Sequence, residues 1–249
     1  MSETTNGDSP TVVLVHGAFA DSSSWTGVIT RLQAEGVPVM APANPLRGIS
    51  IDSAYFASVL AQIDGPVVAV GHSYGGAVIT NAATNAKNVV GLVYVAAFAP
   101  DEGEILGAVE AGSKDSVLNS ALVPRQYPTA SGGSGTELYI DPPKAREAFA
   151  GDLSEEQAAL IAAIQRPVAE SAFSEPNGPP AWKHLPSWTV VATGDKAAGT
   201  DVVRSMAERA GAKITEVDGS HVIMISQPQA VTDVILEAVA AAAHVPVGA

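Results

Sequence analysis

The strongest constraint on the fold of this chain is the sequence GHSYGG at residues 71–76. A short β-branched apolar run precedes it at residues 66–70 and a second apolar run follows at residues 77–83, so the pattern predicts a buried strand that turns directly into a buried helix. In a G-x-S-x-G turn of this kind, the serine lies at a strained strand-to-helix corner at the carboxyl edge of the sheet. Ser73 is therefore predicted to be a nucleophile. The alternative is a glycine-rich turn of an ordinary Rossmann-like fold.

Length and composition favour a globular α/β protein. The 249 residues suffice for one sizeable core with an inserted cap, and 47% hydrophobic against 16% charged residues excludes a disordered chain. The formal net charge of −13 disfavours nucleic acid and anionic membrane surfaces as partners, because the chain has no excess of cations to neutralise phosphates. The chain has no cysteine, so thiolate nucleophiles and disulfides are excluded.

The two ends of the chain are expected to be tails. Residues 1–10 are polar and acidic, without the basic start and apolar run of a signal peptide, and residues 244–249 form the second tail. No apolar stretch is long enough to span a bilayer without interruption. We therefore expect a cytoplasmic protein without a membrane partner. A homodimer is left open.

The apolar runs between these tails alternate with helical patterns, which predicts one domain over residues 11–243 with a mostly parallel sheet of about six strands and helices on both faces. The expected strands are residues 11–15, 37–41, 66–70, 89–96, 188–193 and 213–217. The expected helices are residues 25–35, 52–63, 77–83, 202–210 and a last one that begins near Pro228. Residues 100–185 are rich in Gly, Ser and Pro and predict an inserted helical lid, with short helices near 143–150 and 155–164.

A serine hydroxyl needs a base to take its proton, and five histidines are candidates. They are His16, His72, His184, His221 and His244. His221 follows the expected strand 213–217 and a short turn, so it lies at a carboxyl strand end, where such sheets bind ligands. In folds built around a serine turn of this kind, the triad runs along the chain in the order Ser, acid, His, which also favours His221.

The acid that orients the histidine is expected at another strand end between Ser73 and His221. Asp195 follows the strand 188–193 after one glycine and is preferred. Asp201 is the second candidate, although its position favours the N-cap of the next helix. The remaining acids nearby are expected on a solvated edge of the lid: Asp101, Glu102 and Glu104.

The negative charge that develops on the substrate oxygen needs backbone N–H donors. One is expected from Tyr74, the residue after the nucleophile. The other is expected from the loop after the first strand, where Ala18 is preferred and Phe19 is the alternative.

Four motifs together resemble the α/β-hydrolase superfamily, close to the plant methyl-ester esterases and hydroxynitrile lyases and their bacterial relatives. They are HGA at 16–18, GHSYGG at 71–76, TGDK at 193–196 and GSH at 219–221. The resemblance covers residues 11–100 and 185–243 and is weak over the lid. It implies a triad of Ser73, Asp195 and His221, oxyanion donors at Ala18 and Tyr74, and activity without a cofactor or metal.

Within this branch, two positions favour ester hydrolysis over cyanohydrin cleavage. The lyases carry Thr or Asn after the first-loop histidine, and one group carries Lys after the catalytic histidine, whereas this chain has Gly17 and Val222. The predicted function is therefore a serine hydrolase that cleaves small carboxylic esters or lactones through an acyl-enzyme on Ser73. The alternatives are a hydroxynitrile lyase, a perhydrolase or a C–C hydrolase with the same triad, and a noncatalytic small-ligand-binding homologue. The apolar substrate pocket is expected to include Phe19, Tyr74, Phe98 and Val222.

Overall fold

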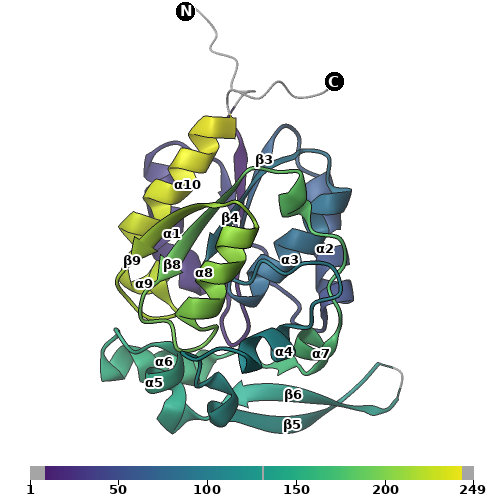
Figure 1. The fold of residues 1–249 in the computed structure, drawn as a ribbon, viewed down its shortest axis with the longest axis vertical. Helices are drawn as coiled ribbons and strands as arrows, with labels where there is room; N and C mark the ends of the chain where they lie inside the picture. Colours follow the sequence, from purple (N-terminus) through teal and green to yellow (C-terminus); the bar gives the residue numbers. More distant parts are fainter. Residues whose placement is uncertain (1–8, 131, 243–249) are drawn as a thin grey trace, which may run out of the picture.

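The computed structural model describes residues 9–130 and 132–242. Residues 1–8 of the first expected tail, and the whole second tail with His244, lie outside the described residues. The described residues form a twisted sheet between two layers of helices, and a smaller lid lies below one edge of that sheet (Figure 1).

The central sheet has six strands in the order β2-β1-β3-β4-β8-β9, and every neighbouring pair is parallel. The strands are β1 Thr11–Val15, β2 Val39–Met40, β3 Val67–His72, β4 Val89–Val95, β8 Ser187–Ala192 and β9 Lys213–Val217. The four inner strands are almost completely buried, as expected of β-branched runs covered on both faces. All six predicted strands are confirmed, and β2 is a short edge strand next to Pro38.

Right-handed crossovers decide which face each helix covers. In the strand order, β2 lies on one side of β1, whereas the later strands follow one another on the other side. The helix between β1 and β2 therefore lies on the opposite face from the other crossover helices, where it packs beside the last helix (Figure 1). The first face carries α1 Thr26–Ala34 and α10 Pro228–Ala242, with the short α9 Ile223–Ser226 nearby. The second face carries α2 Ile49–Ala61, α3 Tyr74–Ala82 and α8 Thr200–Arg209.

The lid lies between β4 and β8 and differs in part from the expectation. Its helices are α4 Leu106–Ala111, α5 Ala145–Phe149, α6 Glu155–Ile164 and α7 Ser171–Ser174, so short helices lie where residues 143–150 and 155–164 predict them. It also holds an antiparallel three-stranded sheet of β5 Leu122–Pro128, β6 Ser134–Ile140 and β7 Val168–Ala169, which the sequence did not predict. The β5–β6 hairpin projects beyond the core at the bottom of Figure 1.

Polar contacts hold this lid against the loops at the carboxyl edge of the sheet. The guanidinium of Arg47, in the loop before α2, pairs with Glu137 of β6 at 3.1 Å and stacks over the Tyr127 ring of β5 at 4.7 Å. The Ala169 N–H of β7 donates to the Leu46 carbonyl at 2.9 Å. The lid therefore covers the edge where a parallel sheet binds its ligands.

Candidate active site

Ser73 lies between the end of β3 and the start of α3 in a backbone conformation that L-residues rarely adopt, with φ 52° and ψ −124°. Strand and helix pass so close here that a Cβ on Gly71 would lie 2.5 Å from the Gly75 carbonyl oxygen, and a Cβ on Gly75 would overlap the Val15 carbonyl. The GHSYGG sequence thus forms the sharp strand-to-helix turn that the G-x-S-x-G pattern predicts.

The described non-glycine residues with a strained backbone conformation all lie at this edge of the sheet. Four described non-glycine residues have a positive φ, and each follows a different strand of the first four: Phe19, Leu46, Ser73 and Ala96. Each such residue costs on the order of 1–3 kcal/mol, so the fold must supply that energy elsewhere. Such strain is common at functional sites, where packing overrides local preference.

His221 and Asp195 form a buried pair at the same edge. His221 Nδ1 lies 2.8 Å from Asp195 Oδ2, and the two side chains are 1% and 0% exposed. The other carboxylate oxygen accepts the backbone N–H groups of Ala197 and Ala198 at 2.9 and 3.1 Å. Because the carboxylate accepts, the Nδ1–H of His221 donates, which leaves Nε2 without a proton and able to act as a base.

The other candidate acids lie elsewhere. The Asp201 carboxylate accepts the Ser113 hydroxyl at 2.5 Å and the Lys114 N–H at 2.9 Å, away from His221. Asp101 pairs with Lys183 at 2.6 Å and Glu104 with Arg209 at 2.5 Å, both at the lid edge. Of the acids considered from the sequence, the structure brings Asp195 to the histidine.

The loop after β1 is braced by His16, whose role the sequence did not indicate. His16 Nδ1 donates to the Gly17 carbonyl at 2.9 Å, and its Nε2 accepts the Asn44 N–H at 2.9 Å. The side-chain amide of Asn44 donates a second hydrogen bond, to the His16 carbonyl at 3.1 Å. Burial lowers the pKa of His16 to about 4, so the ring stays neutral with a fixed tautomer.

At this edge, the structure records no acceptor among the described residues for the backbone N–H groups of Ala18, Phe19 and Tyr74. Ala18 and Tyr74 are the predicted oxyanion donors, and Phe19 is the alternative to Ala18. The Tyr74 hydroxyl donates to the carboxylate of Asp52 in α2 at 2.7 Å. Burial and this carboxylate raise the pKa of Tyr74 well above its usual value, so the phenol is a fixed donor that anchors the start of α3.

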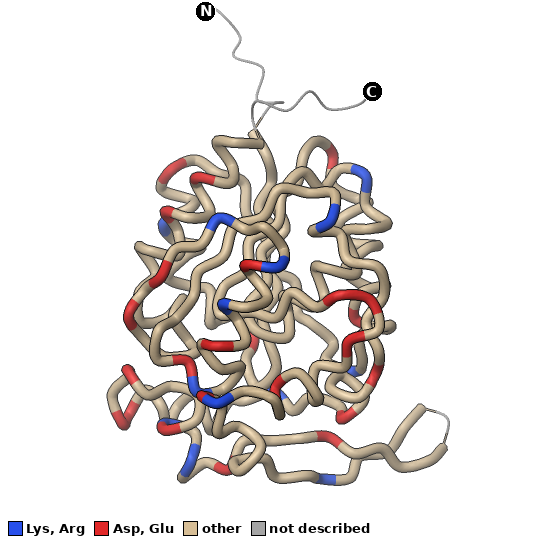
Figure 2. The backbone as a smooth tube through the Cα atoms, in the orientation of Figure 1, with Lys and Arg blue, Asp and Glu red and all other residues tan. Residues whose placement is uncertain are grey.

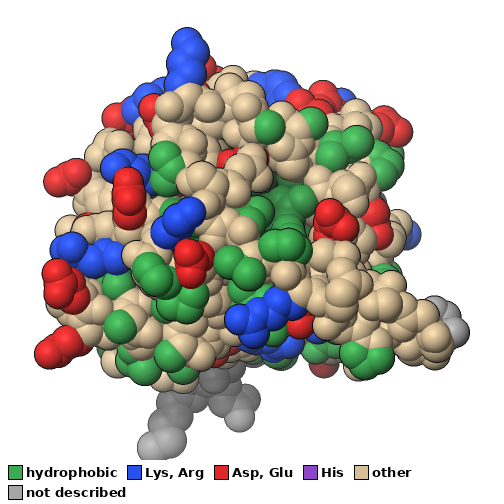
Figure 3. Space-filling view, turned by 90° about the horizontal axis from the view of Figure 1, so that it is seen from below, with side chains coloured by type: hydrophobic (Ala, Val, Ile, Leu, Met, Phe, Trp, Pro, Cys, Tyr) green, Lys and Arg blue, Asp and Glu red, His purple; other side chains and the backbone are tan. Residues whose placement is uncertain are grey.

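An apolar cavity of about 250 Å³ opens beside these loops. Phe19 and Val222 line it, together with Phe149, Leu153 and further residues of α6. Phe98 is not among its lining side chains; it is buried, and its N–H donates to the Ser73 carbonyl at 3.2 Å. Seen from the lid side, the surface is hollowed and lined by hydrophobic side chains near its middle (Figure 3).

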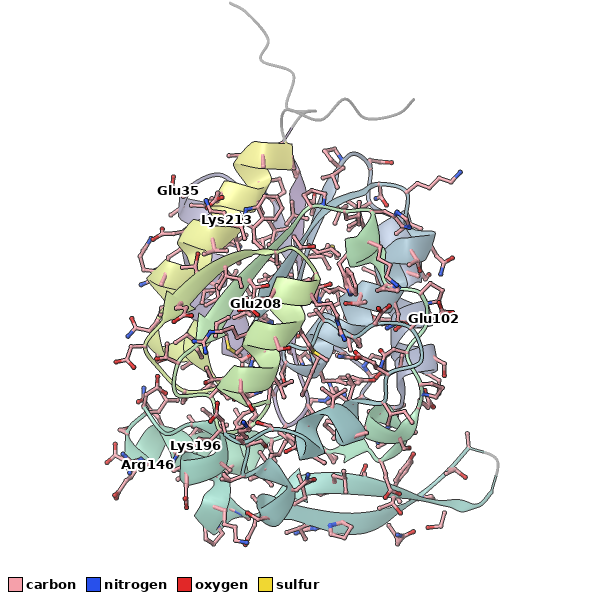
Figure 4. All side chains as sticks on the ribbon, in the orientation of Figure 1. Glu35, Glu102, Arg146, Lys196, Glu208 and Lys213 are labelled. Atoms are coloured by element: carbon pink, nitrogen blue, oxygen red, sulfur yellow. The ribbon has the colours of Figure 1, made fainter. Side chains whose placement is uncertain are left out.

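A second, more polar hollow of about 750 Å³ lies on the seam between lid and core. Arg146 of α5 and Lys196, which follows Asp195, both line it, and their side chains lie near each other in Figure 4. Glu147, Asp152 and Glu155 line it too, so its charges are mixed and favour no ligand of one sign.

In the parts of the chain that the structure describes, no group of three or more His, Cys, Asp or Glu side chains could hold a metal ion. No helix within the same ranges is long and apolar enough to cross a membrane. The cytoplasmic location and the homodimer remain predictions.

Sequence reasoning missed the contacts that support the predicted residues. His72, Asp52 and Asn44 are buried polar residues that bond to the histidine loop, to Tyr74 and to the loop after β1. A polar residue within an apolar run is the signal that could have identified His72. No local pattern marks Asp52 or Asn44, because their partners lie 22 and 28 residues away.

A six-stranded parallel sheet with a serine elbow and a buried His–Asp pair at its carboxyl edge defines an α/β hydrolase. In sequence, residues 12–234 match the alpha/beta hydrolase family. The chain belongs to this family, which confirms the membership that the four motifs predict.

Among characterised relatives, a carbendazim hydrolyzing esterase from Nocardioides sp. (strain SG-4G) is 34% identical over 110 residues, which are 39% of this chain and 46% of that protein. The match thus spans less than half the length of this relative. Polyneuridine aldehyde esterase superimposes with a TM-score of 0.77 at 22% identity, covering 92% of this chain and 98% of the other. A pyrethroid hydrolase from Sphingobium faniae JZ-2 gives 0.75 at 21% identity, covering 93% and 98%. The structural matches establish the shared fold.

Proposed function

We propose that the protein is a serine hydrolase that cleaves small carboxylic esters or lactones through an acyl-enzyme on Ser73. The observation that carries this proposal is the buried His221–Asp195 pair at the edge where Ser73 occupies a strained turn. A noncatalytic binding protein would have no need of a buried histidine–aspartate pair at the same sheet edge as such a serine. The esterases among the relatives support the same class of reaction.

The proposed mechanism gives each of these residues one role. Nε2 of His221 takes the Ser73 proton as the hydroxyl attacks the ester carbonyl, and Asp195 stabilises the imidazolium that forms. The free N–H groups of Ala18 and Tyr74 donate to the oxyanion. The imidazolium then protonates the departing alcohol, and a water molecule, activated by the same histidine, releases the acid.

The walls of the 250 Å³ cavity support an uncharged substrate with one apolar branch. Phe19 and Val222 adjoin the residues proposed for the oxyanion hole and the base, while Phe149 and Leu153 come from the lid. Most of this lining is apolar, so a charged group there would lose its hydration without a partner. We therefore propose esters whose acyl or alcohol part is small and apolar.

Turnover of p-nitrophenyl acetate by the purified protein tests the proposal. Ser73→Ala should lower kcat by roughly 10³-fold or more with the melting temperature unchanged, because one hydroxyl is lost. Asp195→Asn should also lower kcat by orders of magnitude. Asp201→Asn is the matched control: it removes a carboxylate at the start of a helix and should lower kcat by about twofold or less. Hydrolysis that survives in Ser73→Ala would contradict the proposal, and a more damaging Asp201→Asn would move the acid to that residue.

A further inference from the structure

His72 is the last residue of β3 and the immediate neighbour of Ser73, and its ring is completely buried. Its Nε2 lies 3.0 Å from the backbone carbonyl oxygen of His221, so the ring N–H donates to that carbonyl. The two imidazole rings pack at a centroid distance of 4.7 Å, and the Phe149 ring lies against both. One residue thus connects the nucleophile turn to the main chain of the proposed base.

The ring of His72 is held in one protonation state. Its Nδ1 is buried and has no hydrogen-bond partner among the described residues. Burial, followed by the nearby His221, lowers the pKa of His72 well below its usual value. The ring is therefore neutral at physiological pH, with its proton on the Nε2 that bonds to His221.

Stability alone does not explain a histidine at this position. A buried acceptor without a partner costs about 1–3 kcal/mol, and an apolar side chain of similar size would avoid that cost. Among the described residues, the side chain of His72 makes one polar contact, the hydrogen bond to the His221 carbonyl. A buried histidine with an unpaired nitrogen destabilises the fold, so we infer that its hydrogen bond to the His221 carbonyl has a role in the site.

We propose that His72 is a positioning residue, which holds the backbone of His221 in register with Ser73 through its Nε2–H···O=C bond. The inference rests on the function proposed above. Asp195 fixes only the Nδ1 end of the His221 ring, so the imidazole can still move with its own main chain. The bond from His72 removes that freedom relative to the nucleophile, because His72 and Ser73 are consecutive residues. Misplacement by about 1 Å can cost about 10²-fold in rate.

Three substitutions separate this role from a general effect on folding. In His72→Gln the side-chain nitrogen can take the place of Nε2 and keep the bond, whereas His72→Asn is too short to reach the carbonyl. His72→Met fills the space without a donor. The substitution removes the unpaired Nδ1 of His72 but leaves the His221 carbonyl without its donor. Since one buried acceptor without a partner replaces another, the free energy of unfolding should change little. His184→Gln, at an exposed histidine, is the matched control.

The readouts are kcat and KM for p-nitrophenyl acetate, the rate of fluorophosphonate labelling and the melting temperature. We expect kcat and labelling to fall about 10- to 100-fold in the Asn and Met variants, with KM within about twofold, and to recover to within about threefold of wild type in His72→Gln. Equal activity of the Gln and Asn variants would overturn the proposal, even if His72→Met failed to fold. Wild-type protein without turnover or labelling would instead overturn the hydrolase function itself.

Discussion

At the scale of single residues, Gly17 lies directly against the proposed nucleophile. A Cβ at this position would stand 2.7 Å from the Ser73 Cβ and 2.9 Å from the His72 carbonyl oxygen. Both distances are below ordinary van der Waals contact, and one of the atoms is backbone, so relief requires a shift of the elbow itself. Gly17 therefore sets the distance between the oxyanion loop and Ser73.

We expect Gly17→Ala to lower kcat for p-nitrophenyl acetate by about 10- to 100-fold, because the added methyl displaces the nucleophile from its oxyanion donors. Steady-state kinetics and thermal unfolding check this. Gly133→Ala is the control, in the distant hairpin; among the described residues, a Cβ there would meet only the Thr129 hydroxyl, at 3.4 Å. Wild-type kcat in Gly17→Ala would mean that the loop yields without moving Ser73.

At the scale of secondary-structure elements, the lid is attached to the loop that carries His221. Asp152, between α5 and α6, accepts the hydroxyl of Ser220, the residue before His221. Partial burial disfavours the charged carboxylate, but hydrogen bonds from Ser220 outweigh it and hold the pKa of Asp152 below its usual value. This hydrogen bond ties the segment between α5 and α6, two lid helices that line the apolar cavity, to the loop at the carboxyl edge of the sheet.

Asp152→Ala should loosen α5 and α6 while leaving the sheet intact. Amide hydrogen exchange in these two helices should speed up by about 10- to 100-fold, because one charge-assisted hydrogen bond of roughly 1.5–3 kcal/mol is lost, and exchange in α10 should not change. Glu147→Ala on the same rim, a residue for which the structure gives no side-chain bond, is the control. Unchanged exchange in α5 and α6 would show that apolar packing alone holds the lid.

The sequence predicts the core elements better than the lid for a physical reason. β-branched runs such as 11–15 and 67–70 coincide with strands because burial on both faces demands them. Residues 122–128 include Pro124, Arg125 and Pro128, a polar and proline-rich run that forms a strand only by pairing with β6. Likewise, sequence motifs predict Ser73 and His221 as site residues. No local pattern predicts the contacts between distant segments that support them, His72 with His221 and Tyr74 with Asp52.

At the scale of the whole molecule, the chain holds 26 acidic and 13 basic residues, which gives its net charge of −13, and Figure 2 shows both kinds spread along the backbone. Burial lowers the pKa of His16 and of His72, so the interior favours the neutral form of both rings. The pH range in which the fold is stable therefore depends on its interior as well as on its surface.

Folding stability should fall as the pH drops below about 6.5, where unfolded histidines begin to bind protons. The folded His16 resists protonation down to about pH 4, so the unfolded chain binds more protons between these values and is favoured there. Between about pH 7.5 and pH 5 this residue should account for about 2 kcal/mol of unfolding free energy. Urea unfolding at both pH values should show a smaller difference for His16→Asn than for the wild type. Equal differences would contradict the assignment of a neutral, buried His16.

The most direct test of the account is to find where the protein is acylated or phosphonylated. A fluorophosphonate reacts with a serine only when a neighbouring base and oxyanion donors activate it. We predict one label per chain by intact mass, located at Ser73 by peptide mapping, and none in Ser73→Ala; labelling in Asp195→Asn should be slowed by orders of magnitude. An unlabelled wild-type protein, or a label on any residue other than Ser73, would contradict the central claim that this edge of the sheet is a serine hydrolase active site.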